Sequence, residues 1–364
     1  MTIISVVGAR PNFMKAAPVK HAFDRVEGVR HLLVHTGQHY DPNMSDVFFN
    51  DLGMGKPDLF LGVGSGSHAE QTARVMVEFE KVCLAERPAI VIVYGDVNST
   101  MAAAIVAKKL HIPVAHVESG LRSFDRGMPE EINRIVTDSI TDLFFVTEES
   151  GRQNLLLDGV RPQQIHLVGN TMIDSLARLT EGLAAAETGA EGSTPGDYIV
   201  LTLHRPSNVD DPAALARLIE AIEEGAGGCA IRFPVHPRTE SVLQSAGLRQ
   251  RMVESGRWEL LPPAGYRQFI QMVMNARAVV TDSGGIQEET TWLGVPCVTL
   301  RPSTERPSTV ELGTNNLVGV APLAVREGVR RAVAGAGRIR HTVPPLWDGH
   351  AAQRIVRTVL QFLQ

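Results

Sequence analysis

Residues 278–289 read AVVTDSGGIQEE, and this stretch decides the fold of the second half of the chain. The apolar run Ala278–Thr281 predicts a strand, and the two glycines after it allow the close turn from which a helix starts. A strand that passes through such a turn into a helix is the building unit of a parallel α/β sheet. The N–H groups and the positive dipole end of that helix would suit a pyrophosphate. Neither the P-loop pattern nor the G-x-G-x-x-G pattern occurs here, so NAD is not indicated.

The same alternation of short apolar runs and helical patterns extends along the whole chain. In the first half the runs are Ile3–Val7, His31–Thr36, Ala89–Tyr94, Val114–Val117, Leu143–Val146 and Ile165–Val168. In the second half they are Tyr198–Thr202, Ala230–Phe233, Trp258–Leu261, Ala278–Thr281 and Pro296–Leu300. Amphipathic stretches such as Ala69–Ala85, Ser99–Leu110 and Pro129–Ser139 lie between them. Because the runs are almost entirely apolar, we expect helices on both faces of each sheet, in two doubly wound α/β domains in series.

A stretch poor in large apolar residues, LAAAETGAEGSTPG at positions 183–196, interrupts this alternation. Its composition is typical of a linker or loop. We place the domain boundary within 169–196 and assign residues 1–170 to the first domain and 171–346 to the second. One large sheet with an insertion is the alternative, and the restart of strands after the linker disfavours it.

The composition is that of a folding, water-soluble chain. Of the 364 residues, 44% are hydrophobic and 21% charged, and 35 basic against 40 acidic residues give a net charge of −5. That balance disfavours a strongly basic nucleic-acid or membrane binder. The N-terminus reads as a first strand and not as a signal peptide, and no apolar run approaches the roughly 20 residues of a membrane span. We therefore expect a cytoplasmic small-molecule enzyme.

Cysteine and histidine patterns do not indicate a metal site. The 3 cysteines are isolated in the sequence, and the 12 histidines include no H-E-x-x-H pair. We expect His236, in Pro-Val-His-Pro-Arg, to be structural. The expectation is an enzyme without a metal.

Charged residues follow several predicted strands of the first half, where ligands bind in open α/β sheets. Arg10 follows the first strand and Lys15 lies in the next helix, which would make a phosphate clamp. Asp96 follows another strand, although it could simply cap a helix. Glu118 follows a third, with His116 on the same sheet face. Glu130 lies at a helix start, where helix electrostatics alone would explain an acid.

The second half offers a matching set of strand-end residues. Arg-Pro follows the first predicted strand of each half, as Arg10-Pro11 and within His204-Arg205-Pro206. If the two halves face each other, both loops would line one cleft. Ser283, Gly284 and Gly285 would hold a pyrophosphate, and Glu289 lies where a carboxylate can reach ribose hydroxyls. Arg306 lies in a charged loop that could line the cleft or could equally be a solvated surface turn.

Together these motifs resemble the non-hydrolysing UDP-N-acetylglucosamine 2-epimerases over roughly residues 3 to 320. The resemblance rests on the order of several motifs, none of which is specific alone. They are Gly8-Ala9-Arg10-Pro11, Gln38-His39, Gly95-Asp96, the segment His116–Arg122, the segment Pro129–Arg134, Gly169-Asn170-Thr171, His204-Arg205, the segment Pro234–Pro237, the segment Thr281–Glu289 and Thr304-Glu305-Arg306-Pro307. The resemblance implies a glycosyltransferase-B-type fold, with two Rossmann-like domains facing a cleft, a helix at about 349–363 packing back on the first domain, and a homodimer.

The resemblance also implies a reaction and a set of residue roles. UDP is eliminated across C1–C2 of UDP-GlcNAc to leave 2-acetamidoglucal and is added back to give UDP-ManNAc, without a cofactor. Asp96 and Glu118, and then Glu130, match the acid/base positions. The matching residues that bind the UDP-sugar or stabilise its charge are Arg10, Lys15, His204, Arg205, Ser283, Gly284, Gly285, Glu289 and Arg306, with Phe269 near uracil.

The chain departs from the family pattern at Asn12, Ser207 and Ser308, where many members carry acids. Their loss keeps open a UDP-diacetamido-uronic acid as substrate. A hydrolysing epimerase, a glycosyltransferase of the same fold and a non-catalytic nucleotide-sugar binder are further alternatives. The segments Gln38–Asp41 and Gly62–His68 lack the glutamine and arginine of members activated by UDP-GlcNAc, so we expect no such activation.

Overall fold

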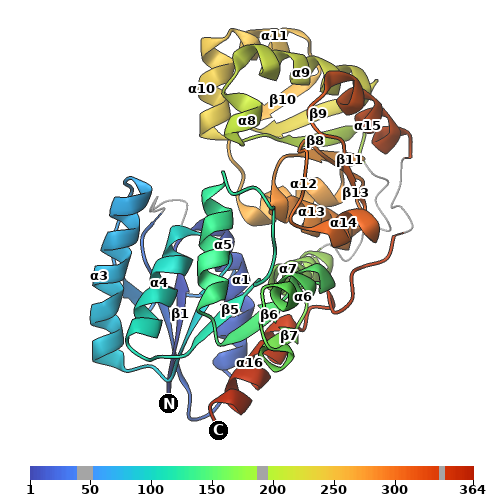
Figure 1. Cartoon of the computed structure of the whole chain (residues 1–364). Helices are drawn as coiled ribbons and strands as arrows, with labels where there is room; N and C mark the ends of the chain where they lie inside the picture. Colours follow the sequence, from blue (N-terminus) through green and yellow to red (C-terminus); the bar gives the residue numbers. More distant parts are fainter. Residues whose placement is uncertain (39–51, 187–195, 336–340) are drawn as a thin grey trace. The chain divides into compact units, whose positions relative to one another are not determined.

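The computed structural model describes residues 1–38, 52–186, 196–335 and 341–364, and the chain divides into two compact units (Figure 1). Unit 1 comprises Met1–Gly182 and Pro345–Gln364, and unit 2 comprises Leu183–Pro344. The division falls after Gly182, further along the chain than residue 170. Helix α7 (Thr171–Ala186) begins in unit 1, where the Ser175 hydroxyl donates to the carbonyl of Met14 at 2.6 Å.

Unit 1 is built on a parallel sheet. Its strands are β1 (Thr2–Val7), β2 (Arg30–His35), β3 (Leu59–Phe60), β4 (Ile90–Tyr94), β5 (Val114–Val117), β6 (Leu143–Val146) and β7 (Ile165–Leu167). Within the described residues the order is β3-β2-β1-β4-β5-β6-β7, and every pair is parallel. The direction in which the chain adds strands reverses between β1 and β4. Ligands bind at such a switch point in open α/β sheets.

Helices cover both faces of this sheet. They are α1 (Arg10–Phe23), α3 (His68–Glu86), α4 (Asn98–Lys109), α5 (Pro129–Ser139), α6 (Glu149–Leu157), the 3₁₀ helix η1 (Pro162–Gln164), α7 and α16 (Ala351–Phe362). Helices α3, α4 and α5 lie side by side on one face, and α1 packs against α16 on the other (Figure 1). The apolar cores are therefore buried on both sides, as expected for continuously apolar strands.

The C-terminal helix α16 is tied to unit 1 by polar contacts at its start. The Asp174 carboxylate accepts the N–H groups of Ala351 and Ala352, at 3.1 and 2.7 Å. Arg354 donates to the carbonyl of Val168 at 2.9 Å. These contacts satisfy N–H groups at the helix start that have no partner within the helix.

Unit 2 repeats the architecture. Its strands are β8 (Tyr198–Thr202), β9 (Ala230–Pro234), β10 (Trp258–Leu261), β11 (Ala278–Thr281), β12 (Cys297–Thr299) and β13 (Asn315–Leu317). In the part of the unit that is described, they form a parallel sheet in the order β10-β9-β8-β11-β12-β13. Its helices are α8 (Pro206–Val209), α9 (Pro212–Ala226), α10 (Pro237–Ser245), α11 (Leu248–Glu254), α12 (Tyr266–Met274), α13 (Gly284–Leu293), α14 (Pro307–Glu311) and α15 (Pro322–Ala334). The switch point lies between β8 and β11.

The predicted strands are found, with ends that differ by a residue or so. Two short strands, β3 and β13, were not predicted because runs of two and three residues carry too little pattern. The predicted linker is wrong at its start, since α7 continues to Ala186 through an alanine-rich stretch of high helix propensity. The expected architecture of two parallel-sheet α/β domains is confirmed.

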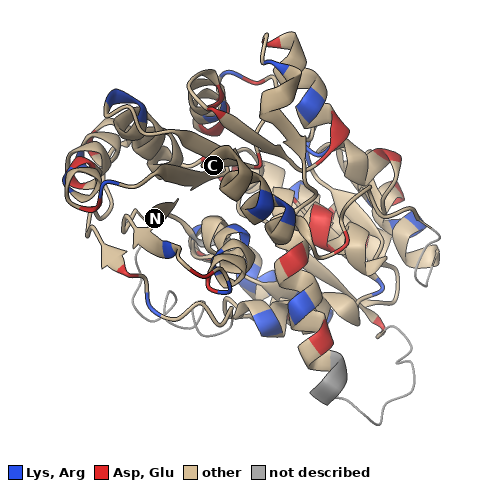
Figure 2. Cartoon of the chain, turned by 90° about the horizontal axis from the view of Figure 1, so that it is seen from below, with Lys and Arg blue, Asp and Glu red and all other residues tan. Residues whose placement is uncertain are grey.

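Charged residues lie on the helices and loops, whereas the strands are almost free of them (Figure 2). Basic and acidic residues are interspersed in this view, in keeping with the small net charge. None of the described helices has the length and apolar character of a membrane span.

Candidate active site

Several of the predicted site residues lie at the switch points of the two sheets. In unit 1, Gly8–Arg10 follows β1 and Gly95-Asp96 follows β4. In unit 2, His204-Arg205 follows β8 and Asp282–Gly285 follows β11. Each unit thus places its candidate residues at the sheet edge where parallel strands end.

Lys15 and Glu118 form a buried ion pair in unit 1. The Lys15 Nζ lies 2.7 Å from Oε2 of Glu118, with side chains 6% and 2% exposed. Lys15 comes from the second turn of α1, and Glu118 directly follows β5. The lysine predicted as a phosphate clamp therefore contacts a predicted acid/base group. Arg10 begins α1, and its side chain lies outside the described part of the structure.

The backbone of Glu118 adopts a conformation that non-glycine residues rarely show, with φ of +69°. The N–H groups of Glu118 and Ser119 both donate to the carbonyl of Phe145, at 3.0 and 3.2 Å. These bonds hold the chain in the left-handed region, which costs of order 1 kcal/mol or more. Backbone strain of this kind persists where the surrounding structure enforces it, and it gathers at functional sites.

The turn that carries Asp96 lies beside this pair. Gly95, with φ of +60°, donates its N–H to the carbonyl of Val117 at 3.0 Å, which joins the loops after β4 and β5. A Cβ atom on Gly95 would come within 2.8 Å of Lys15 Nζ, so only glycine lets the lysine approach this turn. The Asp96 carboxylate is paired with Arg134 of α5. Asp96 and Glu118 are therefore on adjoining loops, each with a cationic partner.

The two glutamates at the start of α5 have different environments. Glu130, the predicted acid/base residue, is exposed. Glu131 is 1% exposed, and its carboxylate accepts the N–H and hydroxyl of Ser123, both at 2.9 Å. Glu131 also pairs with Arg134 at 3.2 Å. The buried glutamate thus orders the loop before α5, and no contact brings Glu130 into the Lys15–Glu118 group in the part that the structure describes.

His116 and Asp138 contact the two loops that carry Asp96 and Glu118. His116 is fully buried, and its Nε2–H donates to the carbonyl of Gly95 at 2.8 Å while Nδ1 is hydrogen-bonded to Asp138 at 2.7 Å. Asp138 also accepts the N–H of Gly120 at 3.1 Å and Nη1 of Arg122 at 2.7 Å. Burial opposes ionisation of this carboxyl, but the hydrogen bonds and positive charge of His116 and Arg122 outweigh it and hold the pKa of Asp138 below its ordinary value.

Asp282 organises the corresponding loop of unit 2. It is fully buried and accepts the N–H of Arg205 at 2.9 Å, Nδ2 of Asn208 at 3.1 Å and Nδ1–H of His204 at 2.9 Å. Burial raises its pKa, but the hydrogen bond and positive charge of His204, with the backbone N–H groups of Arg205 and His204, outweigh burial and leave the pKa of Asp282 below its ordinary value. Because Nδ1 of His204 is held by a carboxylate, Nε2 is the ring atom left for other contacts. The side chain of His204 is 41% exposed.

A buried arginine and two buried carboxylates lie near the start of α13. Arg306 Nε lies 2.9 Å from Oε1 of Glu288, and Arg306 Nη1 lies 3.8 Å from Oε2 of Glu305. A Cβ atom on Gly284 would lie 2.7 Å from Nη1 of Arg306, so the guanidinium rests against the first turn of the helix. Arg205 donates from Nε to the carbonyl of Asp282 at 3.0 Å. The helix start and Arg306 together form a place suited to an anion.

The remaining predicted residues of unit 2 lie near the same helix or on α12. Ser283 is the residue before α13, and its side chain makes no capping hydrogen bond to the helix start. Glu289 is buried within α13 and faces the hydroxyl of Tyr266. Burial and then the negative charge of Glu289 raise the pKa of Tyr266 well above its ordinary value. Phe269 lies partly buried on α12, and Gly285 lies in the first turn of α13.

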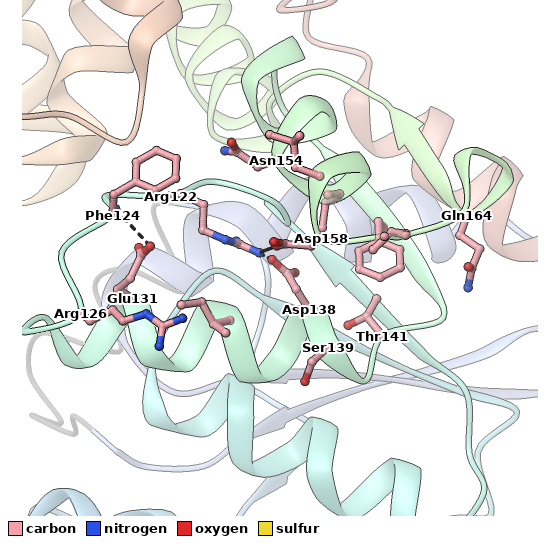
Figure 3. Close-up of a pocket in the computed structure, with 16 residues that line it drawn as sticks. Arg122, Phe124, Arg126, Glu131, Asp138, Ser139, Thr141, Asn154, Asp158 and Gln164 are labelled. Carbon is pink, nitrogen blue, oxygen red and sulfur yellow. Dashed lines mark hydrogen bonds and ion pairs between the residues drawn. The ribbon is translucent and has the colours of Figure 1, made fainter.

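A pocket of about 690 Å³ lies in unit 1 away from the switch point, along α5 and α6 (Figure 3). Arg122, Glu131 and Asp138 line it, together with the exposed ring of Phe124. None of the predicted site residues with described side chains is part of its lining. No cluster of three or more His, Cys, Asp or Glu side chains that could hold a metal ion occurs among the residues described.

Comparison with known proteins decides the family. The family model described as UDP-N-acetylglucosamine 2-epimerase matches residues 21–360. The chain belongs to the UDP-N-acetylglucosamine 2-epimerase family. The resemblance inferred from the motifs is therefore confirmed.

Two relatives of this epimerase family carry different substrate names. The UDP-N-acetylglucosamine 2-epimerase of Methanocaldococcus jannaschii is 40% identical over 365 residues, covering 98% of each chain. The UDP-2,3-diacetamido-2,3-dideoxy-D-glucuronate 2-epimerase of Pseudomonas aeruginosa is 41% identical over 337 residues, covering 92% of each. A crystal structure of the M. jannaschii enzyme in complex with UDP-GlcNAc and UDP matches with a TM-score of 0.87 over 99% of this chain and 100% of that one.

The departures from the family pattern have a structural basis at Asn12. Its Oδ1 accepts the N–H groups of Gly8 and Ala9, both at 3.2 Å, and its Nδ2 donates to the carbonyl of Tyr94 at 2.9 Å. A glutamate could not donate to that carbonyl. Asn12 therefore joins the ends of β1 and β4, the strands that flank the switch point. Ser207 is exposed and Ser308 partly buried. His39, Tyr40 and Asp41 lie outside the described residues.

Sequence reasoning missed the residues that hold the candidate groups in place. They are Asp138, Asp282 and Arg134 together with Glu131, Glu288 and Glu305. Asp282 could have been found, because it is the first polar residue after a strand that ends at a switch point. Asp138 and Arg134 lie in the middle of a helix, where a charged residue is ordinarily a surface residue.

Proposed function

We propose that this protein interconverts UDP-N-acetylglucosamine and UDP-N-acetylmannosamine by inverting C2 of the sugar. The observation that carries the proposal is the pair of adjoining loops bearing Asp96 and Glu118 at the switch point of unit 1, with Lys15 bound to Glu118. Inversion at C2 requires a proton to leave one face of the carbon and another to arrive on the opposite face. Two carboxylates on adjoining loops supply two such groups, and family membership supports this reaction.

The reaction is an elimination followed by an addition. A carboxylate takes the C2 proton while the C1–O bond breaks, the oxygen of UDP leaves with the bonding electrons, and 2-acetamidoglucal forms. UDP then adds back to C1 as a proton is delivered to the other face of C2. Stabilising the departing diphosphate is the main electrostatic demand.

We assign that stabilisation to unit 2 and, in unit 1, to Arg10. The start of α13 with Ser283, Gly284 and Gly285 offers backbone N–H groups and a positive dipole end. Arg306, beside Gly284, adds a cation, and Asp282 presents His204 with its Nε2 available. Arg205, Phe269 and Glu289 are assigned to the rest of the nucleotide. Glu130 remains a third acid/base candidate.

A UDP-2,3-diacetamido-uronic acid is a second candidate substrate. It is supported by the 41% identity to a relative with that name and by the replacement of three family acids by Asn12, Ser207 and Ser308. Fewer carboxylates in the loops would lessen repulsion of a sugar carboxylate.

Incubation of the purified protein with UDP-GlcNAc in D2O, followed by proton NMR, tests the proposal. We expect loss of the H2 signal together with growth of UDP-ManNAc, and neither change with the Glu118→Gln variant. UDP with free ManNAc would instead indicate a hydrolysing enzyme. An unchanged spectrum with UDP-GlcNAc and turnover of the uronic acid would favour the second substrate, and binding without turnover of either would contradict the epimerase proposal.

We also propose that the protein is a homodimer of the cytoplasm, where nucleotide sugars are available. The support is the family, since homodimers are usual among the epimerases that the motifs resemble. Light scattering coupled to size-exclusion chromatography measures the assembly, and a single-chain mass would contradict the dimer.

A further inference from the structure

We infer that His116 is a positioning residue for the proposed epimerase, setting the loops of Asp96 and Glu118 together through Gly95 and Asp138. This inference rests on the proposed function. His116 is 0% exposed, so it acts only through the groups it touches. Those groups are the carbonyl of Gly95, which precedes Asp96, and the carboxylate of Asp138.

Both ring nitrogens of His116 have a hydrogen-bond partner in this arrangement. Nε2 faces a carbonyl oxygen at 2.8 Å, and a carbonyl can only accept. Nδ1 faces Asp138 at 2.7 Å, and hydrogen bonds and positive charge keep the pKa of that carboxyl low despite burial. The ring therefore connects α5, through Asp138, to the loop that carries Asp96, through Gly95. We call this connection the tie.

Asp138 extends the tie to the loop that carries Glu118. One carboxylate oxygen, Oδ1, accepts from His116, and the other, Oδ2, accepts the N–H of Gly120 at 3.1 Å. Gly120 lies two residues after Glu118, whose left-handed backbone is held on the other side by Phe145. A single carboxylate of α5 thus fixes the turns beside both proposed acid/base residues. Two groups that must act on opposite faces of one carbon require this kind of mutual placement.

The Asp138 carboxylate also forms an ion pair with Arg122. Arg122 Nη1 lies 2.7 Å from Asp138, and Nη2 lies 2.9 Å from Asp158. Figure 3 shows Arg122 reaching between these two aspartates at the wall of the pocket. Since Asp158 is 56% exposed, the chain of contacts runs from the surface of unit 1 to Gly95.

Two amide substitutions of His116 each remove one of its two contacts and keep the other. In His116→Gln the amide nitrogen can reach the place of Nε2 and donate to Gly95, but contact with Asp138 is lost. In His116→Asn the amide nitrogen takes the place of Nδ1 and keeps Asp138, but Gly95 is no longer reached. We expect kcat to fall about 100-fold in His116→Asn, the scale of misplacing a reacting group by about 1 Å. His116→Gln removes the contact with Asp138 that connects α5 to the loop of Asp96, so we expect kcat to fall on the same scale there.

Two further measurements separate positioning from stability. We expect KM for the UDP-sugar to change less than about threefold in His116→Asn, because the groups assigned to UDP lie elsewhere. His31→Asn is the matched control, since it truncates another buried histidine of the same sheet that donates to no candidate loop. Amide hydrogen exchange should be faster at Asp96 in His116→Asn, where Gly95 is released, and faster at Gly120 in His116→Gln, where Asp138 is released, and unchanged at both in the control.

Each outcome bears on one proposal. Wild-type kcat in both His116 variants, or equal exchange at Asp96 in the two variants, would overturn the positioning role. If His116→Asn fails to fold, Asp138→Asn replaces it, and unchanged exchange at Asp96 and Gly120 in that variant would overturn the inference. A wild-type protein that turns over no UDP-sugar would overturn the proposed function, whereas the exchange comparison would still decide the positioning of the loops.

Discussion

The Nζ of Lys15 lies 2.7 Å from Oε2 of Glu118, with the two side chains 6% and 2% exposed. Neither charge is screened well by water, so each depends on the other. Lys15 comes from the helix after the first strand, whereas Glu118 follows the fifth, and the pair therefore links the strand ends on either side of β4. The backbone of Glu118 is held at φ of +69°, in the left-handed region that non-glycine residues rarely adopt.

Lys15→Met should leave Glu118 buried without its counter-charge. We expect the free energy of unfolding of unit 1 to fall by about 3 kcal/mol and epimerisation to be lost. The double variant Lys15→Met with Glu118→Gln should recover much of the stability but none of the activity. Urea unfolding of the three variants measures the coupling. Additive losses in the double variant would contradict a direct pair.

Asp282→Asn should reduce kcat by about 100-fold or more, as expected when a carboxylate no longer orients a catalytic imidazole. The reason is that Asp282 accepts Nδ1–H of His204 together with the backbone of Arg205 and the amide of Asn208. The measurement is kcat and KM as a function of pH. His236→Asn is the control, because His236 lies beside the His204 ring but caps α10. A larger loss in the control than in Asp282→Asn would argue against this orientation.

The strand ends could be predicted from the sequence because apolar runs stop where charged residues begin. Asp96, Glu118, His204 and Ser283 were located in this way, and the switch points place them at sheet edges. The strand pattern is local, and burial on both faces makes it nearly continuous. This part of the fold needs no knowledge of distant contacts.

The partners of these residues could not be predicted, because each depends on packing between distant segments. Lys15 could equally contact a phosphate or a carboxylate until α1 and β5 are placed in one sheet. Helix periodicity does not say which of Glu130 and Glu131 faces inward, since neighbouring helix residues lie about 100° apart. The partner of Asp96 is Arg134, whose position follows from α5 packing against α4.

Acid should destabilise unit 1 between pH 6.5 and 4. Burial lowers the pKa of His31 and of His35 to about 4, so the unfolded chain binds more protons than the folded one in this window. The free energy of unfolding therefore rises with pH there, by up to about 1.4 kcal/mol per pH unit for each proton. Asp174 has the opposite effect on this slope. Burial raises the pKa of its carboxyl to about 6, so at this residue the folded chain binds more protons than the unfolded chain. His31→Gln should flatten the slope by about one proton in urea unfolding, and an unchanged slope would exclude His31 as the cause.

The rate with UDP-ManNAc alone should depend hyperbolically on its concentration. The segments Gln38–Asp41 and Gly62–His68 lack the glutamine and arginine of the activated members. Gln38 is already engaged, since its Oε1 accepts the N–H and hydroxyl of Ser99 at 3.1 and 2.7 Å. Initial rates over a range of UDP-ManNAc concentrations provide the measurement. A sigmoidal curve that trace UDP-GlcNAc relieves would contradict independence from this activator.

Gly284→Ala should weaken binding of the UDP-sugar by displacing Arg306. The new Cβ would lie 2.7 Å from Nη1 of Arg306, a distance that forces the guanidinium or the first turn of α13 to move. Because Arg306 is buried against Glu288, it has little room to move without weakening that ion pair. We expect KM for UDP-GlcNAc and the inhibition constant of UDP to rise about tenfold or more, the scale of one lost hydrogen bond to a charged group. Gly228→Ala, also in unit 2 and with no atom within 4 Å of its new Cβ, is the matched control and should leave both constants unchanged. If Gly284→Ala left the UDP inhibition constant at the wild-type value, the diphosphate would bind elsewhere than at the start of α13.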